Sequence, residues 1–139
     1  MIKQGVEPYL EVSSRGDKRF SALYARLASY NLNSIEQLYQ SSKQFDLDQP
    51  GVDTMGHMKN WRDAKGKTPK NLAFVAWLYD HLWRIYLMEH PEFIPVLIQA
   101  SGLSDVFGQP GSQCQAVTLW SIREEYKATG GIRLPPRPT

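Results

Sequence analysis

Apolar residues recur at helical spacing in several stretches of the chain, and the strongest of these is NLAFVAWLYDHLWRIYLMEH at residues 71–90. Thr68 and Pro69 precede it and supply an N-cap and a first-turn proline. Its apolar residues form two stripes that leave only a narrow polar face. We therefore expect this helix to lie at the centre of the core.

Capping-box patterns mark the starts of two further helices. Ser34 followed by Gln37 precedes a helix that is expected to end near Gln44. Ser112 followed by Gln115 begins a C-terminal helix, SQCQAVTLWSIREEYKATGG, which the glycines at its end would terminate.

The remaining segments predict one short helix and little strand. Residues 91–101, PEFIPVLIQAS, are expected to be helical and to end at Gly102 in the left-handed conformation. Residues 8–13 and 19–24 alternate partly and are joined by the turn-like SRGDK, which predicts two brief strands. Residues 46–67 are polar, rich in Gly and Asp and almost free of periodicity, which predicts a long loop with one helical turn near its end.

A chain of 139 residues with 42% hydrophobic and 22% charged residues has the composition of one ordinary globular domain. The predicted fold class is therefore mostly α (α+β), a single compact helical domain over residues 1–139 with a few short strands near the N-terminus. Residues 1–7 and 132–139 are expected to be frayed termini.

Charge and cysteine content limit the possible binding partners of the protein and its cellular compartment. A net charge of +2 is too small to serve as an electrostatic footprint for nucleic acid unless the cations cluster. The single cysteine excludes an internal disulfide framework, and the N-terminal residues lack the apolar run of a signal peptide. No stretch approaches 18 consecutive apolar residues. We therefore expect a cytoplasmic protein with no membrane partner.

Several familiar chemical motifs are incomplete. KGKT at residues 65–68 resembles part of a phosphate loop, but Trp61 stands where that pattern needs its first glycine. The histidines lack carboxylate or cysteine partners at a recognised metal spacing, so neither a metal nor a cofactor is expected. Cys114 has no obvious base beside it and is interpreted as structural. The basic residues between Lys59 and Lys70 lie close together and could meet a phosphate or pyrophosphate.

Two segments carry groups suited to a binding site. The first expected helix places Glu36, Tyr39, Gln40 and Lys43 on one face, at i, i+3, i+4 and i+7. Asp105 lies in GLSDVFGQPGSQCQA, a glycine-bounded loop ahead of a helix whose free N–H groups favour an anion. Residue types alone also allow a solvated helix face and a turn-stabilising aspartate.

Three segments taken together resemble the NADAR superfamily, whose members include N-glycosidases that act on ADP-ribosyl groups and on riboflavin-pathway intermediates. FSALYARL followed by SIEQLYQSSKQF is similar to the family's SNFY-like strand and its S-V-E-H-x-Y-Q-x-x-K-F segment. HPEFIPVLIQASG is similar to NPELRELLLATG, and SDVFGQPGSQCQAVTLWSIR is similar to DPFWG followed by GxNxLGxLLMxIR. Order and spacing match over residues 19–126, whereas Phe107 replaces a tryptophan and residues 53–69 have no counterpart. The layout from RGDKRFSALYARL to NWRDAKGK also resembles that of small phage and plasmid proteins, so the chain resembles a divergent family member of phage or plasmid type.

The resemblance implies catalysis by Glu36, Asp105 and Lys43. Cleavage of an N-glycosidic bond develops positive charge on the ribose, and Glu36 would stabilise that charge or activate the attacking water. Asp105 would orient water or hold ribose hydroxyls, and Lys43 with the loop cations would meet phosphates. The substrate-binding residues implied with them, of which the aromatic ones would stack on a base, are Ser21, Tyr39, Gln40, Trp61, Phe107, Gly108, Lys65 and Lys67.

Two other functions remain open. The same pocket could bind a nucleotide or an ADP-ribose derivative without cleaving it, as a sensor or a phage counter-defence protein would. Alternatively, Lys59–Lys70 with Trp61 could form a nucleic-acid surface, because basic residues interleaved with an aromatic can hold a strand. A cleft that joins Glu36, Lys43 and Asp105 would favour the glycosidase, whereas the nucleic-acid surface should be exposed and far from Glu36.

Overall fold

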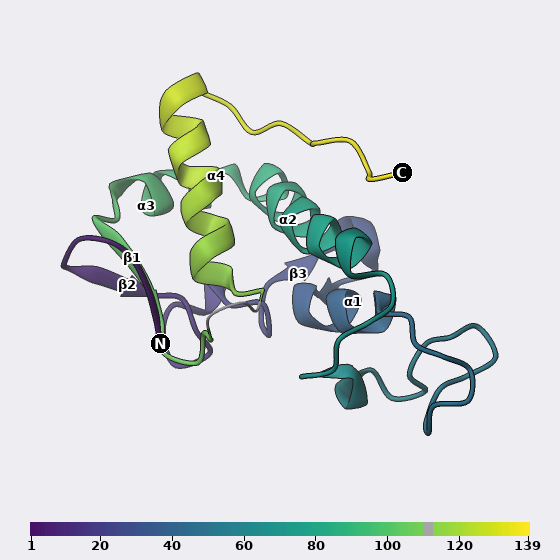
Figure 1. Cartoon of the computed structure of the whole chain (residues 1–139). Helices are drawn as coiled ribbons and strands as arrows, with labels where there is room; N and C mark the ends of the chain where they lie inside the picture. Colours follow the sequence, from purple (N-terminus) through teal and green to yellow (C-terminus); the bar gives the residue numbers. More distant parts are fainter. Residues whose placement is uncertain (110–112) are drawn as a thin grey trace.

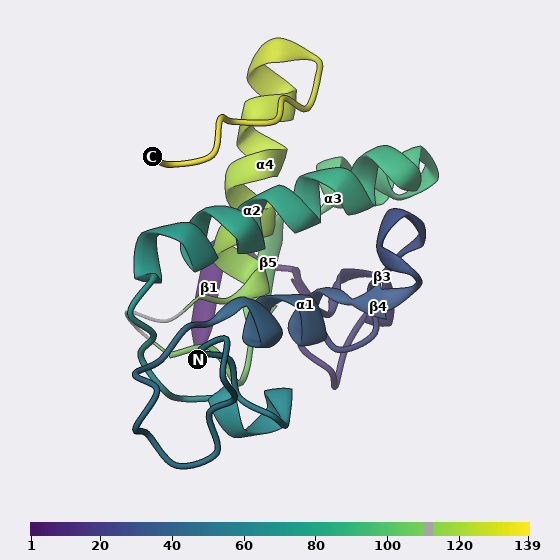
Figure 2. The same ribbon diagram turned by 90° about the vertical axis from the view of Figure 1, so that its right-hand side faces the viewer.

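Helix α2 (Leu72–Glu89) crosses the middle of the computed structural model, which describes residues 1–109 and 113–139 (Figure 1). It contacts α1 (Ile35–Ser42) and α4 (Gln115–Thr129), while α4 also contacts α3 (Ile94–Gln99). Figure 2 shows α1 beneath α2, with α4 standing across it. The fold is mostly helical with small sheets, which confirms the predicted class.

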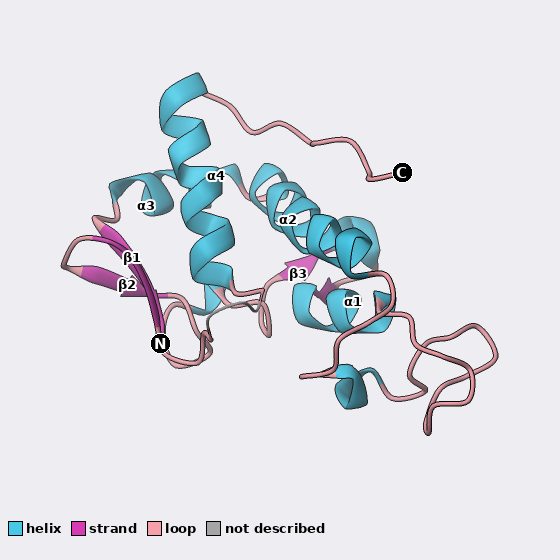
Figure 3. Cartoon of the chain, in the orientation of Figure 1, coloured by secondary structure: helices cyan, strands magenta, loops and turns pink. Residues whose placement is uncertain are grey.

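A three-stranded sheet lies beside α4 (Figure 3). Its central strand is β5 (Gly102–Asp105), which pairs antiparallel with β1 (Ile2–Gly5) and parallel with β2 (Tyr9–Glu11). Because both edges of β5 are paired and α4 contacts it, all four of its residues are buried. The sequence predicted a loop for this segment, since a strand of four residues is too short to show its alternation.

The second predicted strand, residues 19–24, is absent. A 3₁₀ helix, η1 (Lys18–Phe20), takes its first part, and turns follow. Asp17 caps η1 by accepting a hydrogen bond from the backbone N–H of Arg19, and this local capping outweighs the weak strand alternation. A two-stranded ribbon, β3 (Arg26–Leu27) with β4 (Asn33–Ser34), forms instead, on either side of the 3₁₀ helix η2 (Ala28–Tyr30).

The start of α1 follows the predicted capping pattern, whereas the start of α2 does not. Ser34 Oγ accepts a hydrogen bond from the N–H of Gln37 at 3.1 Å, as expected for the N-cap. Helix α2 begins after Asn71 rather than at Thr68. The backbone N–H of Lys70 donates to the carbonyl of Gln44 at 2.7 Å, so this segment is held to the end of α1 and cannot enter the helix.

In the C-terminal half, Gly102 does not terminate a helix. A 3₁₀ turn, η4 (Pro91–Phe93), leads into α3, which ends at Gln99. Gly102 instead opens β5, where a Cβ would stand 2.5 Å from Cδ1 of Tyr9. The glycine is therefore needed for close approach of two strands rather than for a left-handed cap. Helix α4 begins at Gln115, and its predicted N-cap, Ser112, lies outside the described residues.

One hydrophobic cluster joins the sheet, the ribbon and the helices. Trp83 and Leu82 on α2 are completely buried in it, together with Leu119 on α4 and Leu103 on β5. Leu103 stands in the central strand, so the cluster connects the sheet to the helices. The predicted central place of α2 in the core is therefore observed.

Residues 132–139 do not hang free of the fold. Trp77 Nε1 donates to the carbonyl of Pro135 at 3.0 Å, and Arg84 donates to the carbonyl of Arg133 at 3.0 Å. The Arg137 guanidinium lies 4.7 Å from the centre of the Phe74 ring. The tail thus contacts the face of α2 that carries Phe74, Trp77 and Arg84, and at the other terminus residues 2–5 form β1. Both termini differ from the expected frayed ends.

The segment between α1 and α2 has its own small core. Phe45, Met58 and Ala64 are buried together, with Val52 packed against them. The 3₁₀ helix η3 (Trp61–Ala64) lies where the sequence predicted a helical turn and contacts α1. Few of the residues in this segment belong to helix or strand, yet their side chains pack.

Glu89 ties the end of α2 to η2, and we expect this contact to depend on pH. Its carboxylate accepts hydrogen bonds from the N–H groups of Ala28 (2.8 Å) and Ser29 (3.2 Å) and from the Ser29 hydroxyl (2.6 Å). Burial alone would raise the pKa of Glu89, but these hydrogen bonds outweigh it and hold the pKa below its usual 4.5. The carboxylate's contribution to stability is therefore present above pH 4.5 and is lost as the pH falls through the lowered pKa.

Glu89→Gln should lower the free energy of unfolding at pH 7 by about 1–2 kcal/mol, because the charge is lost and an amide NH2, which cannot accept a hydrogen bond, replaces one of the two accepting oxygens. Urea unfolding at pH 7 and at pH 3 measures the effect. The difference between wild type and variant should shrink at pH 3, and an undiminished difference there would mean that the charge is not responsible.

Candidate functional site

A cavity of about 620 Å³ lies between α1, the start of α2, the turn at residues 65–69, the end of β5 and the start of α4. We call it the main cavity. The predicted site residues that line it are Ser21, Glu36, Tyr39, Gln40, Lys43, Lys65, Lys67, Asp105 and Phe107. The residues singled out on the α1 face and in the segment after β5 therefore meet across one cavity, although about 65 residues separate them.

Glu36 enters the main cavity from the first turn of α1. Its backbone N–H donates to the carbonyl of Ala22 at 3.0 Å, which joins the helix start to the preceding segment. The side-chain amide of Gln40 donates to Glu36 Oε1 at 2.9 Å. Because Gln40 is only 5% exposed, this hydrogen bond holds the Glu36 carboxylate in one orientation.

Tyr39 and Lys43 continue the same face of α1. The Tyr39 ring meets the Tyr79 ring edge-on at 5.1 Å, and the Lys43 ammonium lies 5.2 Å from the centre of the Tyr39 ring. Burial raises the pKa of Tyr39, and the charge of Glu36 adds to that shift. Tyr39 is therefore a neutral phenol at physiological pH.

Lys43 donates most of its hydrogen bonds to the backbone of the protein itself. Its side chain is buried, and Nζ donates to the carbonyls of Ala64 and Lys67, each at 3.0 Å. Burial lowers the pKa of Lys43, while the charge of Glu36 acts in the opposite direction. An ammonium has three hydrogens, so one remains for the cavity.

Asp105 forms the opposite wall at the end of β5, and its side chain lies in a hydrogen-bonded row. Asp105 is 2% exposed; Oδ1 accepts from the N–H of Phe107 at 3.0 Å, and Oδ2 accepts from Gln115 Nε2 at 2.7 Å. Gln115 Oε1 in turn accepts from the Tyr79 hydroxyl at 3.2 Å. Burial raises the pKa of Asp105, and the charge of Glu11 adds to it. The aspartate is thus held in place and is harder to ionise than a free carboxyl group.

The charges of Glu36 and Asp105 both influence the buried phenol of Tyr79. Burial raises its pKa well above the usual value, and the charges of Glu36, Cys114 and Asp105 add to that shift. The row from Tyr79 through Gln115 to Asp105 is a chain of neutral donors and acceptors that ends on a carboxylate.

The rim of the main cavity has a basic part and an apolar part. Lys65 and Lys67 are exposed on one part of it. Leu23, Leu72 and Phe107 are large apolar side chains that also line the cavity and are exposed. Exposed apolar groups at a cavity mouth favour a flat or apolar ligand group, and the lysines favour an anionic one.

Two predicted site residues lie elsewhere. Trp61 is half-buried at the start of η3, with the Arg62 guanidinium 4.5 Å from its ring, and it does not line the main cavity. Gly108 is buried, and a Cβ there would stand 2.6 Å from Ile2 Cγ1, so it packs against β1. Trp61 contacts its neighbour Arg62, whereas Gly108 packs against Ile2 at the other end of the chain, and the sequence pattern reveals neither contact.

The basic segment does not form a surface remote from Glu36. Its cations are exposed, but Lys65 and Lys67 share the main cavity with Glu36. Lys70 forms an ion pair with Asp46 at 3.2 Å. The separation that a dedicated nucleic-acid surface requires is therefore not observed.

Sequence reasoning missed Tyr79 and Gln115 as site residues. Tyr79 is one of the apolar positions of the helix predicted at residues 71–90, and the pattern places those positions in the core; Gln115 is part of a predicted capping box. The hydroxyl of Tyr79 was the available signal, since a buried tyrosine hydroxyl needs a partner, but Tyr86 in the same stripe gives the same signal. Nothing in the local sequence pairs Gln115 with either Tyr79 or Asp105.

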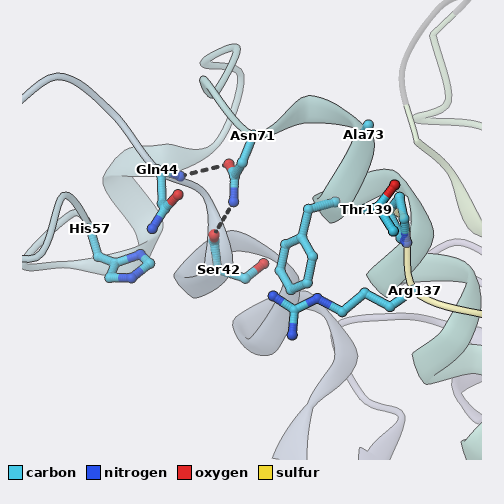
Figure 4. A pocket seen from close by; sticks show the side chains of 9 residues that line it. Ser42, Gln44, His57, Asn71, Ala73, Arg137 and Thr139 are labelled. Atoms are coloured by element: carbon cyan, nitrogen blue, oxygen red, sulfur yellow. Dashed lines mark hydrogen bonds between the residues drawn. The ribbon is translucent and has the colours of Figure 1, made fainter.

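A second cavity, of about 450 Å³, lies where the C-terminal tail reaches the start of α2 (Figure 4). Asn71 joins two segments there: its Oδ1 accepts from the N–H of Gln44 at 2.9 Å, and its Nδ2 donates to the carbonyl of Ser42 at 3.0 Å. His57 Nδ1 lies 3.0 Å from the carbonyl of Lys43 and acts as the donor, because a carbonyl only accepts. These polar groups serve the fold, and we assign no ligand to this cavity.

Asn71→Ala should lower the free energy of unfolding by about 1–3 kcal/mol, because it leaves two backbone groups of the α1 end without partners. Chemical denaturation measures the change. Asn71→Asp keeps the acceptor for Gln44 and loses the donor to Ser42, so it should fall between wild type and Asn71→Ala. Equal stability of all three proteins would contradict a joining role for this side chain.

Within residues 1–109 and 113–139, no group of three or more His, Cys, Asp and Glu side chains is arranged to hold a metal ion. In the same part of the chain, no helix combines the length and apolar character needed to cross a bilayer. No family model matches the chain, and no curated protein matches it.

Proposed function

We propose that the chain is an N-glycosidase that hydrolyses the N-glycosidic bond of an ADP-ribosyl or related nucleotide or riboside substrate in the main cavity. The observation that carries the proposal is the meeting of Glu36, Asp105 and Lys43 around one cavity of about 620 Å³. Carboxylates suit the positive charge that develops on the ribose, and a rim with lysines and apolar side chains suits phosphate and base. The chain's resemblance to NADAR sequences supports the same reaction.

In the proposed reaction, the oxygen of a water molecule bonds to C1′ of the ribose while the bond from C1′ to the base nitrogen breaks. Glu36 takes one proton from the water, and the leaving nitrogen then receives it, so the products are the 1′-hydroxyl sugar and the free base. Gln40 holds the Glu36 carboxylate toward this task through its hydrogen bond to Oε1. Asp105, held by Gln115, accepts hydrogen bonds from ribose hydroxyls.

A binding protein without catalysis is the second candidate, and one observation favours it. Both Asp105 oxygens already accept hydrogen bonds, from Phe107 and Gln115, which leaves Glu36 as the carboxylate with an uncommitted oxygen among the described residues of the cavity. A site with one such group would retain a nucleotide or an ADP-ribose derivative, as a sensor or sequestering protein does.

The test separates the two functions. Purified protein is incubated with ADP-ribosylated nucleobases, ADP-ribose and riboflavin-pathway ribosides; released base is measured by mass spectrometry and binding by calorimetry. Release of base is expected from the glycosidase. Binding without release would assign the sequestering function, and absence of both would overturn the proposal for these substrates.

A further inference from the structure

We infer that Lys43 is a positioning residue that holds the turn Ala64–Lys67 as a phosphate-binding subsite at the rim of the main cavity. The inference deepens the proposed function and rests on it for the identity of the whole substrate. It gives Lys43 a different task from the catalytic one that the sequence suggested. Three features support this role: the geometry of the turn, the hydrogen bonds that Lys43 donates to it, and the two exposed lysines that the turn carries.

The four residues Ala64–Lys67 form a type II turn. Lys65 has φ −60° and ψ 132°, Gly66 has φ +78°, and the N–H of Lys67 donates to the carbonyl of Ala64 at 3.1 Å. The positive φ at the third position favours glycine, since other L-residues are strained there. The turn therefore presents Lys65 and Lys67 on the two sides of a glycine.

Lys43 reaches both ends of this turn from α1. Its Nζ donates to the carbonyls of Ala64 and Lys67, the first and last residues of the turn. The Lys43 side chain is 4% exposed, so water competes little for these hydrogen bonds. Because two of its three ammonium hydrogens are used on the backbone, Lys43 fixes the position of the turn against α1.

The rim lysines are available for an anion. Neither Lys65 nor Lys67 forms an ion pair with any described residue, whereas Lys70, three residues further on, is paired with Asp46. The space in front of Gly66 is open, because a Cβ placed there would meet no atom within 4 Å. A phosphate can therefore approach the backbone of Gly66 with a lysine on either side, which is a favourable arrangement of charge.

Binding measurements with Lys43→Met test the positioning role, and inorganic pyrophosphate, ADP-ribose and an unphosphorylated riboside are the probes. The variant should bind pyrophosphate and ADP-ribose about tenfold or more weakly, because the turn that carries Lys65 and Lys67 is no longer held in place; a tenfold loss corresponds to about 1.4 kcal/mol. Its affinity for the riboside should remain within about twofold of wild type. Lys59→Met, which removes an exposed cation of the same segment outside the cavity, is the matched control and should change neither affinity.

Hydrogen exchange supplies a second readout that loss of charge alone would not move. The Lys67 amide, which closes the turn, should be protected in the wild type and should exchange faster in Lys43→Met. In Lys65→Gln/Lys67→Gln, pyrophosphate affinity should fall while the exchange rate at residue 67 stays that of the wild type. This double variant changes only exposed side chains, so it tests the subsite even if Lys43→Met fails to fold.

Three outcomes would overturn the inference. They are a wild-type protein that does not bind pyrophosphate, a Lys67 amide that exchanges in the wild type as fast as in an unstructured peptide, and an equal loss of riboside and ADP-ribose affinity in Lys43→Met. The last would place Lys43 at the reacting bond. If the wild type binds pyrophosphate but neither binds nor cleaves any riboside, the proposed function fails while the subsite stands.

Discussion

Replacing Glu36 by glutamine is expected to slow release of the base by about 10²–10⁴-fold, because the variant cannot take a proton from water or balance the positive charge on the ribose. Glutamine keeps the size of the side chain, and its carbonyl oxygen can still accept the hydrogen bond from Gln40. Ligand affinity should therefore change by only a few fold. Base release by mass spectrometry and binding by calorimetry measure the two effects separately.

Glu92→Gln is the matched control, since Glu92 is an exposed glutamate in η4 outside the main cavity. It should cleave substrate at the wild-type rate. Unchanged turnover in Glu36→Gln would mean that Glu36 takes no part in the reaction. A parallel loss of binding and turnover would instead show that Glu36 holds the substrate without acting on the bond.

Arg123→Met is expected to lower the free energy of unfolding by about 3–5 kcal/mol, because it leaves three backbone carbonyls without their donor and each unsatisfied buried acceptor costs about 1–3 kcal/mol. Arg123 extends from α4 and donates to the carbonyls of Leu97 (3.1 Å), Ile98 (3.0 Å) and Ala100 (2.7 Å) at the end of α3. Methionine fills similar space but leaves these carbonyls without their donor. The segment affected leads directly into β5, which ends at Asp105.

Denaturant unfolding with a tryptophan fluorescence signal measures this change. Arg26→Met is the control, because Arg26 is exposed and donates only to the carbonyl of Leu32 at 3.0 Å, so its loss should cost less than about 1 kcal/mol. Arg123→Lys should recover only part of the loss, since one ammonium cannot reproduce the planar donors of a guanidinium. A stability of Arg123→Met equal to that of Arg26→Met would mean that the carbonyls are satisfied by water.

Local signals explain what the sequence predicted correctly in the fold. The helical period and a capping serine placed α1, and the long apolar stretch placed α2, because both depend on neighbours within a few residues. Strand β5 was missed for the opposite reason. Its four residues carry no readable alternation, and its partners β1 and β2 lie about 100 and about 90 residues earlier in the chain. Pairing of that kind is decided only when the chain folds.

The candidate site, too, was partly predictable from local sequence and partly decided by distant contacts. The helical period alone put Glu36, Tyr39, Gln40 and Lys43 on one face of α1, since i, i+3, i+4 and i+7 coincide on any helix. Whether that face met water or a cavity depended on distant parts of the chain: α2 and η3 contact α1, and the turn at 64–67 and the end of β5 line the cavity in front of it.

Tertiary structure also decided what individual groups are free to do. Lys43 looks in the sequence like a cation for a ligand, but two carbonyls from residues 21 and 24 positions away occupy most of its hydrogens. Asp105 looks like a turn residue, and Gln115 and Tyr79 join it only through folding. Residue type and period thus determined which side chains share a helix face, whereas burial and hydrogen-bond partners, which come from non-local packing, determined their chemistry.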